Sequence, residues 1–519
     1  MFIVSQLLKP KLILGDVGEL LYICAHEMIL TRMSERKTIY LCLAHMSEEG
    51  VEQKYVKEAF DTNWVVPMGP NVTAFEKDLE QFVASPSQPS TEGKASAQGE
   101  GQQEPLAPKV VCLSAGTAAV HLALIACGVG QGDEVCVQSF TFCASSHPIT
   151  YLGAKPVFID SERDTWNMDP QLLELAILDR KAKTGRLPKA IIPVALYGMP
   201  YDCERIMAVA SKYGIPVIED AAEGMGSRFD GKMLGTFGRF GVLSFNGNKM
   251  ITTSGGGALI CNGNLNQGPT AEGTEVQAEN LCATPEDDAS QIMWYATQAR
   301  DAYPYYEHTA IGYNYRMSNV CAGIGRGQMT VVDAHIAHHK HVQQLYRQLL
   351  KDVPGITLHE QPSDPRYDSN FWLCAATLDE NVRIKGQDSA YKHVVTTAVG
   401  GAAGVIKAVE SATTECQPND NVEALRVYML ERKVECRPVW KPMHKQPVYV
   451  GGERMSDERL AVSGERIVCM TSDRSVAYVN GVSEEIFKVG MCLPAGPCVS
   501  DEDVAYIVET IKSAILPKD

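Results

Sequence analysis

The chain has 519 residues, of which 45% are hydrophobic, and it carries a formal net charge of -16 at pH 7. A chain of this length buries a large core and is expected to form at least two domains. Its negative charge argues against nucleic acid or an anionic membrane as a partner, because both attract positively charged surfaces. The 16 cysteines show no CxxC pair and no zinc-ligand spacing, which predicts reduced thiols, no metal site and a cytoplasmic protein.

Residues 1–37 are expected to form an N-terminal extension. Charged residues interrupt each of its apolar stretches, so neither a signal peptide nor a membrane span is predicted. A second possible start at Met33 leaves the first residue of the natural chain open.

From Val110 onward, short apolar runs alternate with helical patterns, which predicts an α/β fold with a largely parallel sheet flanked by helices. The expected strands are 109–113, 134–139, 155–160, 189–196, 215–220, 238–245 and 257–261. The expected helices between them are 117–127, 170–180 and 202–213. Ligands of such sheets bind beyond the carboxyl ends of the strands, where this reading places Asp160, Tyr197 and Asp220.

The pattern changes after about Val331 to a helix rich in His, Gln and Arg, followed by short strands and a closing helix at 501–515. We therefore expect a large domain at 38–330 and a smaller C-terminal α+β domain at 331–519. Three polar or weakly patterned stretches are predicted to be surface insertions: 85–108, 262–290 and 397–421.

Lys249 and Asp220 are the candidate catalytic residues. A lysine amine can hold the aldehyde of pyridoxal phosphate (PLP) as a Schiff base, and an aspartate at a strand end can keep the pyridine nitrogen protonated. Taken singly, each residue has a plainer interpretation, because most lysines are solvated and most such aspartates cap a turn.

Other candidates surround this pair. Gly116 and Thr117 open a helix directly after a strand and predict an anion site, although a simple helix cap has the same pattern. Ser244 precedes Lys249 by five residues and could add a phosphate donor. Phe142 could stack on the cofactor ring or belong to the core, and Glu223 could face the phenolic oxygen of the cofactor or the substrate. The triple glycine at 255–257 is not followed by the GK[ST] of a phosphate loop, so we expect close backbone packing there.

Together these segments resemble the DegT/StrS-type nucleotide-sugar aminotransferases, a branch of the fold-type-I PLP enzymes. The resemblance runs from about residue 38 to 515. Its marks are NWVVPMGPNV at 63–72, SAGTAA at 114–119, YLGAKPVF at 151–158, EDAAE at 219–223, SFNGNKMITTSGGG at 244–257, GYNYRMS at 312–318 and RPVWKPMH at 437–444.

The resemblance implies roles for residues at the matching positions. Lys249 would be the Schiff-base lysine and proton shuttle, and Asp220 the partner of the pyridine nitrogen. Asn314 would complete the site of a neighbouring subunit, so a homodimer with shared active sites is implied. The candidates for contacting the nucleotide sugar are Tyr306, His308, Arg316, Lys441 and His444, each with the alternative of supporting the dimer.

The implied reaction moves an amino group from an amino-acid donor, glutamate in this family, to a nucleotide-linked 4-keto-6-deoxy sugar for amino-sugar and polysaccharide biosynthesis. Two alternatives are a 3-keto sugar as acceptor and a PLP-binding regulatory protein without turnover. Two departures from the family pattern bear on the sugar: Ala195 stands where many members carry His, and CLAH at 42–45 replaces Ser-Pro-Pro-His.

Overall fold

The computed structural model describes residues 36–85, 107–263, 283–389, 416–450, 454–462 and 465–517. The expected N-terminal extension lies outside the described residues apart from its last two positions. Most of each expected insertion also lies outside them. Within the described ranges, no helix is both long and apolar enough to cross a membrane.

The central sheet consists of two sets of strands. The first runs in the order β1 (Lys109–Leu113), β9 (Gly257–Cys261), β8 (Phe240–Ser244) and β5 (Ile218–Asp220). The second runs in the order β4 (Ala190–Ile192), β2 (Glu134–Gln138), β3 (Lys155–Ile159), β16 (Val476–Val479), β15 (Glu465–Ser472) and β14 (Arg454–Val462). Parallel bridges from residue 191 to 217 and from 194 to 220 join β4 to β5, so the sheet is continuous.

The strands from β8 through β5, β4, β2 and β3 to β16 are parallel, whereas β9 is antiparallel to both β8 and β1. The carboxyl ends of β5 and β8 therefore share one edge, and Asp220 and Ser244 are the last residues of these two strands. Each expected strand contains an observed one. The strands β4 and β5 are shorter than expected because Pro193 and Pro216, which lack an N–H group, flank them.

Helices cover this sheet, and their sequences explain how they are buried. The helix α4 (Gly116–Ala126) is apolar on nearly all sides and is almost entirely buried. The helix α7 (Cys203–Tyr213) buries only Cys203, Ile206 and Ala210, begins at an Asp202 cap and ends at a left-handed glycine. The other helices here are α5 (His147–Tyr151) and α6 (Pro170–Thr184).

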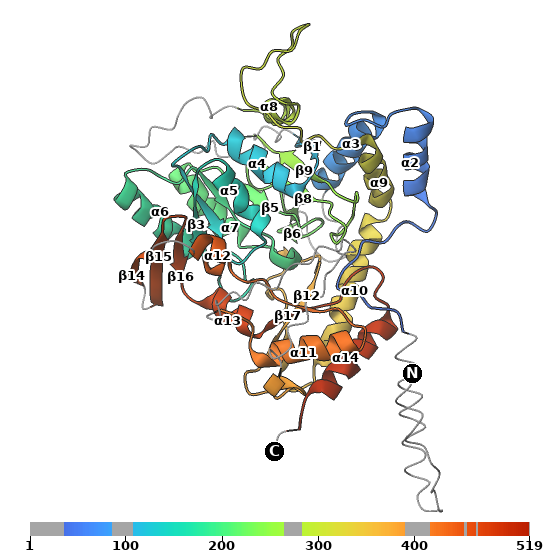
Figure 1. Ribbon diagram of the computed structural model, residues 1–519, viewed down its shortest axis with the longest axis vertical. Helices are drawn as coiled ribbons and strands as arrows, with labels where there is room; N and C mark the ends of the chain where they lie inside the picture. Colours follow the sequence, from blue (N-terminus) through green and yellow to red (C-terminus); the bar gives the residue numbers. More distant parts are fainter. Residues whose placement is uncertain are drawn as a thin grey trace, which may run out of the picture.

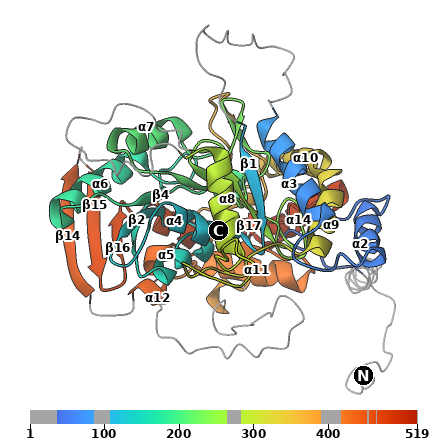
Figure 2. The same cartoon turned by 90° about the horizontal axis from the view of Figure 1, so that it is seen from above.

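The helices α2 (Val51–Asp61), α3 (Pro70–Ala84) and α9 (Asn319–Met329) pack together at one end of the molecule (Figure 1). The strands β14, β15 and β16 lie at the opposite end (Figure 2). Short elements complete this part: η2 (Cys143–Ser145), η3 (Leu196–Gly198), β6 (Arg228–Phe229), β7 (Lys232–Met233) and β11 (Tyr367–Asp368).

The C-terminal part builds a second sheet in the order β10 (Ile356–Leu358), β12 (Cys374–Leu378), β17 (Gly490–Leu493) and β13 (Arg437–Pro438). Its core, shared by three helices, includes Val342, Tyr346, Leu425 and Ile507. These helices are α10 (Val332–Leu350), α11 (Asp420–Glu431) and α14 (Asp501–Ala514). The remaining elements are η5 (Gln387–Ser389), η6 (Met443–Lys445), α12 (Pro447–Val450) and α13 (Val482–Val489).

Two features differ from the sequence-based expectation. The strands β14 to β16 lie in the C-terminal third of the chain, yet β16 pairs with β3 in the large sheet. The prediction of a surface insertion at 262–290 was wrong for its last six residues, because α8 (Pro285–Ala296) begins there. Its acidic residues resemble a loop, but Asp287 completes a capping box and Asp288 is buried against Arg239 at 2.6 Å.

Candidate active site

Lys249 lies in the loop between β8 and β9, at the carboxyl edge of the sheet. Its Nζ is 2.8 Å from Glu223 Oε1 and 4.1 Å from the centroid of the Trp372 ring. The lysine side chain is 12% exposed. The amine therefore lies in a nearly buried space between a carboxylate and the face of an indole.

Asp220 ends the strand next to the one that leads to Lys249. Its Oδ2 accepts a hydrogen bond of 2.5 Å from the Ser145 hydroxyl, which also lies 2.8 Å from Thr141 Oγ1. Burial raises the pKa of the Asp220 carboxyl, while the Ser145 hydroxyl, the Ala222 N–H group and the charge of Lys249 oppose this effect. A cationic group placed against this carboxylate would offset the cost of its burial.

Glu223 is a second buried carboxyl beside the lysine. Burial raises its pKa, and the charge of Lys249 and its hydrogen bond lower it. The second oxygen, Oε2, accepts a hydrogen bond of 2.9 Å from the Tyr197 N–H group. Both carboxylate oxygens of Glu223 therefore accept a hydrogen bond, one from the Tyr197 backbone and one from the Lys249 amine.

The expected phosphate turn and Ser244 meet at the start of α4. The N-cap residue Ala115 makes no side-chain hydrogen bond to the first turn of this helix. A Cβ added to Gly116 would lie 3.2 Å from Ser244 Cβ, so the Ser244 hydroxyl is beside the helix start. A Cβ added to Gly257 would lie 2.4 Å from Gly116 N, which confirms close backbone packing at this glycine. Among the described residues, no hydrogen bond engages the amides of Gly116 and Thr117. These amides and the hydroxyl of Ser244 can together receive an anion.

Four aromatic side chains, Phe142, Tyr197, Trp372 and Trp440, form a group beside Lys249, which we call the aromatic wall. The Trp440 ring centroid is 5.5 Å from that of Phe142, 5.1 Å from Tyr197 and 6.4 Å from Trp372. Phe142 is 54% exposed, so much of its side chain is open to a ligand. This exposure argues against plain core packing for Phe142.

Arg316 lies at the end of β1, beside the phosphate turn. Its backbone bridges Leu113, and the neighbouring Tyr315 carbonyl accepts a hydrogen bond of 2.7 Å from Ser114 N. The Nε atom of Arg316 is buried and has no hydrogen-bond partner among the described residues. A buried guanidinium donor at this position fits an anionic ligand. Lys441 is half-buried and follows Trp440 of the aromatic wall.

His444 is placed differently from the other candidates. Its side chain is 1% exposed, with Nδ1 2.6 Å from Ser139 Oγ and Nε2 3.2 Å from Glu484 Oε1. Burial alone would raise the pKa of the Glu484 carboxyl, but His444 and Lys445 lower it to about 2. His444 thus ties the C-terminal loop to the end of β2, a role within its own chain that differs from both the expected sugar contact and support of the dimer.

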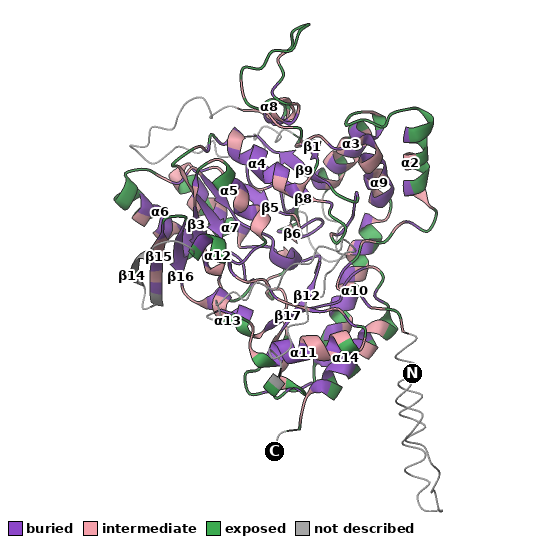
Figure 3. Ribbon diagram, in the orientation of Figure 1, coloured by how far each residue is buried: buried purple, intermediate pink, exposed green. Residues whose placement is uncertain are grey.

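Asn314, Tyr306 and His308 lie on an arm that follows α8, defined here as residues 297–314. The arm projects from the body of the protein and is mainly exposed (Figures 1 and 3). Tyr306 is 79% exposed and packs on Arg300, and His308 Nδ1 is 2.9 Å from the Gln298 carbonyl oxygen. Among the described residues, no hydrogen bond or ring contact joins these three side chains to the lysine of their own chain.

Sequence reasoning missed Ser145, Trp372 and Asn370, whose Nδ2 donates a hydrogen bond of 2.8 Å to the carbonyl oxygen of Glu223. Ser145 stands three residues after Phe142 in a hydroxyl-rich run after β2, and that run was the only available signal. Asn370 and Trp372 precede β12, more than a hundred residues beyond Lys249, and no local pattern connects them to it.

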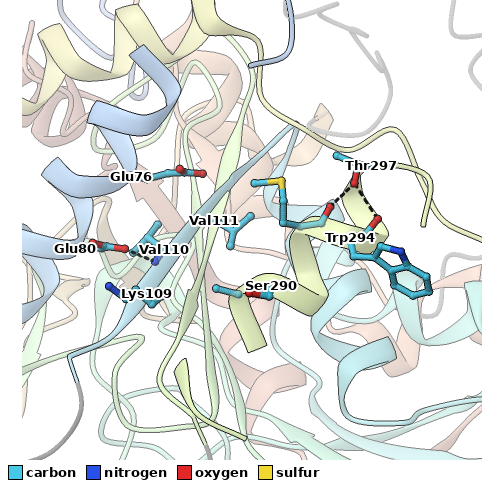
Figure 4. Close-up of a pocket in the computed structure, with 10 residues that line it drawn as sticks. Glu76, Glu80, Lys109, Val110, Val111, Ser290, Trp294 and Thr297 are labelled. Carbon is cyan, nitrogen blue, oxygen red and sulfur yellow. Dashed lines mark hydrogen bonds between the residues drawn. The ribbon is translucent and has the colours of Figure 1, made fainter. Parts of the chain in front are cut away.

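A separate surface cavity of about 510 Å³ lies between α3, β1 and α8 (Figure 4). None of the predicted site residues lines it. Glu76 and Glu80 project into it from α3, and their carboxylates accept hydrogen bonds from Cys112 N at 3.0 Å and Val110 N at 3.3 Å. These carboxylates satisfy N–H groups along the outer edge of β1.

Comparisons with known proteins agree with this fold. The model of the DegT/DnrJ/EryC1/StrS aminotransferase family matches residues 106–402. EpsN of Bacillus subtilis (strain 168), a protein assigned to the pyridoxal phosphate-dependent aminotransferases, is 36% identical over 475 residues, which cover 92% of this chain and 95% of EpsN. GDP-perosamine synthase of Escherichia coli O157:H7 is 28% identical over 472 residues, which cover 91% of this chain and 98% of that enzyme. The crystal structure of a DegT DnrJ EryC1 StrS aminotransferase from Brucella abortus has a TM-score of 0.64 and 23% identity, covering 90% of this chain and 95% of that one.

The fold is that of a fold-type-I PLP-dependent transferase. The chain belongs to the DegT/DnrJ/EryC1/StrS aminotransferase family, and its cofactor is pyridoxal 5'-phosphate.

Proposed function

We propose that this enzyme transfers an amino group from glutamate to the keto carbon of a nucleotide-linked 4-keto-6-deoxy sugar, as a step in amino-sugar and polysaccharide biosynthesis. The observation that carries the proposal is the cluster of Lys249, Asp220 and Glu223 at the carboxyl edge of the sheet. The similarity to GDP-perosamine synthase over 91% of the chain supports a nucleotide sugar as the acceptor.

The residues present fit PLP. When bound, the cofactor supplies an electron-withdrawing ring that stabilises negative charge on the carbon next to the transferred nitrogen. The open first turn of α4 and Ser244 would receive the phosphate, and Phe142 would cover one ring face. Asp220, supported by Ser145, would hold the proton on the ring nitrogen.

Lys249 moves the proton. When it is not bonded to the cofactor, its Nζ would take a proton from the α-carbon of the donor, which requires a neutral amine. Glu223 Oε1 lies 2.8 Å from Nζ and accepts the proton that the ammonium must lose first. Burial raises the pKa of the Glu223 carboxyl, which makes it a stronger base for this step than an exposed glutamate.

The homodimer is part of the proposal, because Asn314, Tyr306 and His308 make no contact with the lysine of their own chain among the described residues. Exposed apolar side chains on the arm favour a protein surface as its partner: Tyr303 49%, Tyr305 59%, Tyr306 79% and Ile311 84% exposed. Asn314 would complete the phosphate site of the second copy, and Tyr306 and His308 would contact the sugar there. Arg316 and Lys441 would bind the nucleotide sugar from the chain that carries the lysine.

The reaction can be tested in its two halves by absorbance. Adding glutamate to the purified yellow enzyme should abolish the cofactor band, and adding the correct keto sugar should restore it. A panel of UDP- and GDP-linked 4-keto and 3-keto sugars identifies the acceptor. If only the 3-keto sugars restore the band, the acceptor is a 3-keto sugar and not a 4-keto-6-deoxy sugar. No response to glutamate would support a PLP-binding regulator instead.

The variant Lys249→Ala should abolish the response to glutamate while the protein stays folded. The control is Lys57→Ala, because Lys57 lies on α2 with a side chain that is 73% exposed. Retained turnover in Lys249→Ala would refute the role of Lys249.

A further inference from the structure

Trp372 holds Lys249 at two points. The face of its indole lies 4.1 Å from Lys249 Nζ, measured to the ring centroid. The edge of the same ring donates a hydrogen bond of 2.7 Å from Nε1 to the carbonyl oxygen of Asn248, the residue before the lysine. One side chain thus contacts both the backbone entering Lys249 and the end of its side chain.

The tryptophan is itself rigidly placed. Trp372 is 2% exposed, and its backbone N–H group donates a hydrogen bond of 2.8 Å to Asn370 Oδ1. Asn370 Nδ2 donates to the carbonyl oxygens of Glu223 at 2.8 Å and Met225 at 2.9 Å. The short segment before β12 therefore orients both groups that contact the amine, the indole directly and Glu223 through its backbone.

A lysine side chain that is not bonded to the cofactor has many rotamers available. An ammonium over an indole face is attracted by the negative charge of the ring face, and burial strengthens this attraction. Together with the Glu223 carboxylate at 2.8 Å, the indole leaves the amine one preferred position.

We propose that Trp372 is a positioning residue that holds the unbonded amine of Lys249 against Glu223, at the place from which it exchanges protons and returns to the cofactor. This inference rests on the proposed role of Lys249 and assigns Trp372 no contact with the sugar.

The direct test measures the rate at which an acylating reagent modifies Lys249 in the cofactor-free protein at a fixed pH of about 8. Mass spectrometry follows the modification, and the rate is divided by that of Lys57 in the same sample. Trp372→Met removes the ring but keeps an apolar side chain of useful size. Acylation of Lys249 should become roughly 3- to 30-fold faster, from the usual strength of a cation–π contact. Trp372→Phe keeps a weaker ring and loses the bond to Asn248, so a smaller increase of about twofold is expected.

The matched control is Trp440→Met, since Trp440 belongs to the aromatic wall and its ring lies 6.4 Å from Trp372, but it makes no cation–π contact with Lys249 among the described residues. It should leave the acylation of Lys249 unchanged. An unchanged rate in a folded Trp372→Met variant overturns the proposal. If only Trp372→Phe folds, absence of any increase in that variant does the same.

A second readout uses glutamate deuterated at its α-carbon. Misplacing the amine should slow the loss of the cofactor band about tenfold and raise the deuterium isotope effect, because proton removal becomes the slow step. A wild-type rate and isotope effect in Trp372→Met would contradict the proposal. Neither measurement contains a sugar. A wrong assignment of the sugar acceptor would therefore be revealed only by the panel of keto sugars and would leave the test of Trp372 unaffected.

Discussion

Replacing Glu76 by glutamine is expected to stabilise the protein at pH 8 and to have little effect at pH 5. Burial raises the pKa of the Glu76 carboxyl from 4.5 to about 7; the charge of Glu80 adds to this effect, and the hydrogen bond from Cys112 N opposes it. Because the folded pKa is the higher one, the unfolded chain ionises first as the pH rises. Stability is therefore lost between pH 4.5 and about 7 and stays low above that range.

The size of the effect follows from this difference. A pKa raised by about 2.5 corresponds to about 3 kcal/mol lost at pH 8 in the wild type. Glutamine cannot ionise, and its carbonyl oxygen can still accept the hydrogen bond from Cys112 N. Glu76→Gln should therefore recover up to about 3 kcal/mol at pH 8.

The assay is urea unfolding and thermal unfolding of both proteins at pH 5 and pH 8. The control is Glu58→Gln, because Glu58 is an exposed residue of α2 and its change should alter stability equally at both pH values. A Glu76→Gln variant with no gain at pH 8, or with the same gain at both pH values, would refute the reasoning.

Three further changes test the active site. Gly257→Ala places a Cβ 2.4 Å from Gly116 N and should weaken PLP binding at least about tenfold by fluorescence titration, whereas Gly255→Ala, which meets no atom within 4 Å, should not. Asp220→Asn should retain PLP but slow the half-reaction with glutamate by a factor on the order of 100, which stopped-flow absorbance measures; a wild-type rate would exclude the proposed partner of the ring nitrogen. Asn314→Ala should weaken PLP retention, and mixing it with Lys249→Ala should restore about a quarter of the sites, because half of the dimers are mixed and each rebuilds one site. No recovery on mixing would exclude a shared site.

Much of the sheet could be predicted from the sequence, because short β-branched runs ended at prolines, glycines and polar residues. The place of Asp220 at the carboxyl end of a strand was predicted, whereas the pairing of its strand β5 with β8, which ends at Ser244, is known only from the structure. The contacts of Trp372 and Asn370 could not be predicted, because they depend on how the segment before β12 docks. His444 belongs to a strong motif, but only packing reveals that it is buried against Ser139.

The same distinction applies to the arm after α8. Its motif predicted the importance of Asn314, and the structure places that residue on an exposed projection, with Arg316 at its base beside β1. In the proposed homodimer these two residues of one motif would serve different sites, and residue order alone does not separate them.

The pairing of β16 with β3 has a consequence for synthesis of the chain. Residues 157–159 find their partners only at residues 476–478, more than three hundred positions later. While the ribosome is still making the C-terminal third, β3 presents an unpaired edge of buried residues to other nascent chains. Chaperone protection of this edge would be most valuable in the interval before residue 479 leaves the exit tunnel.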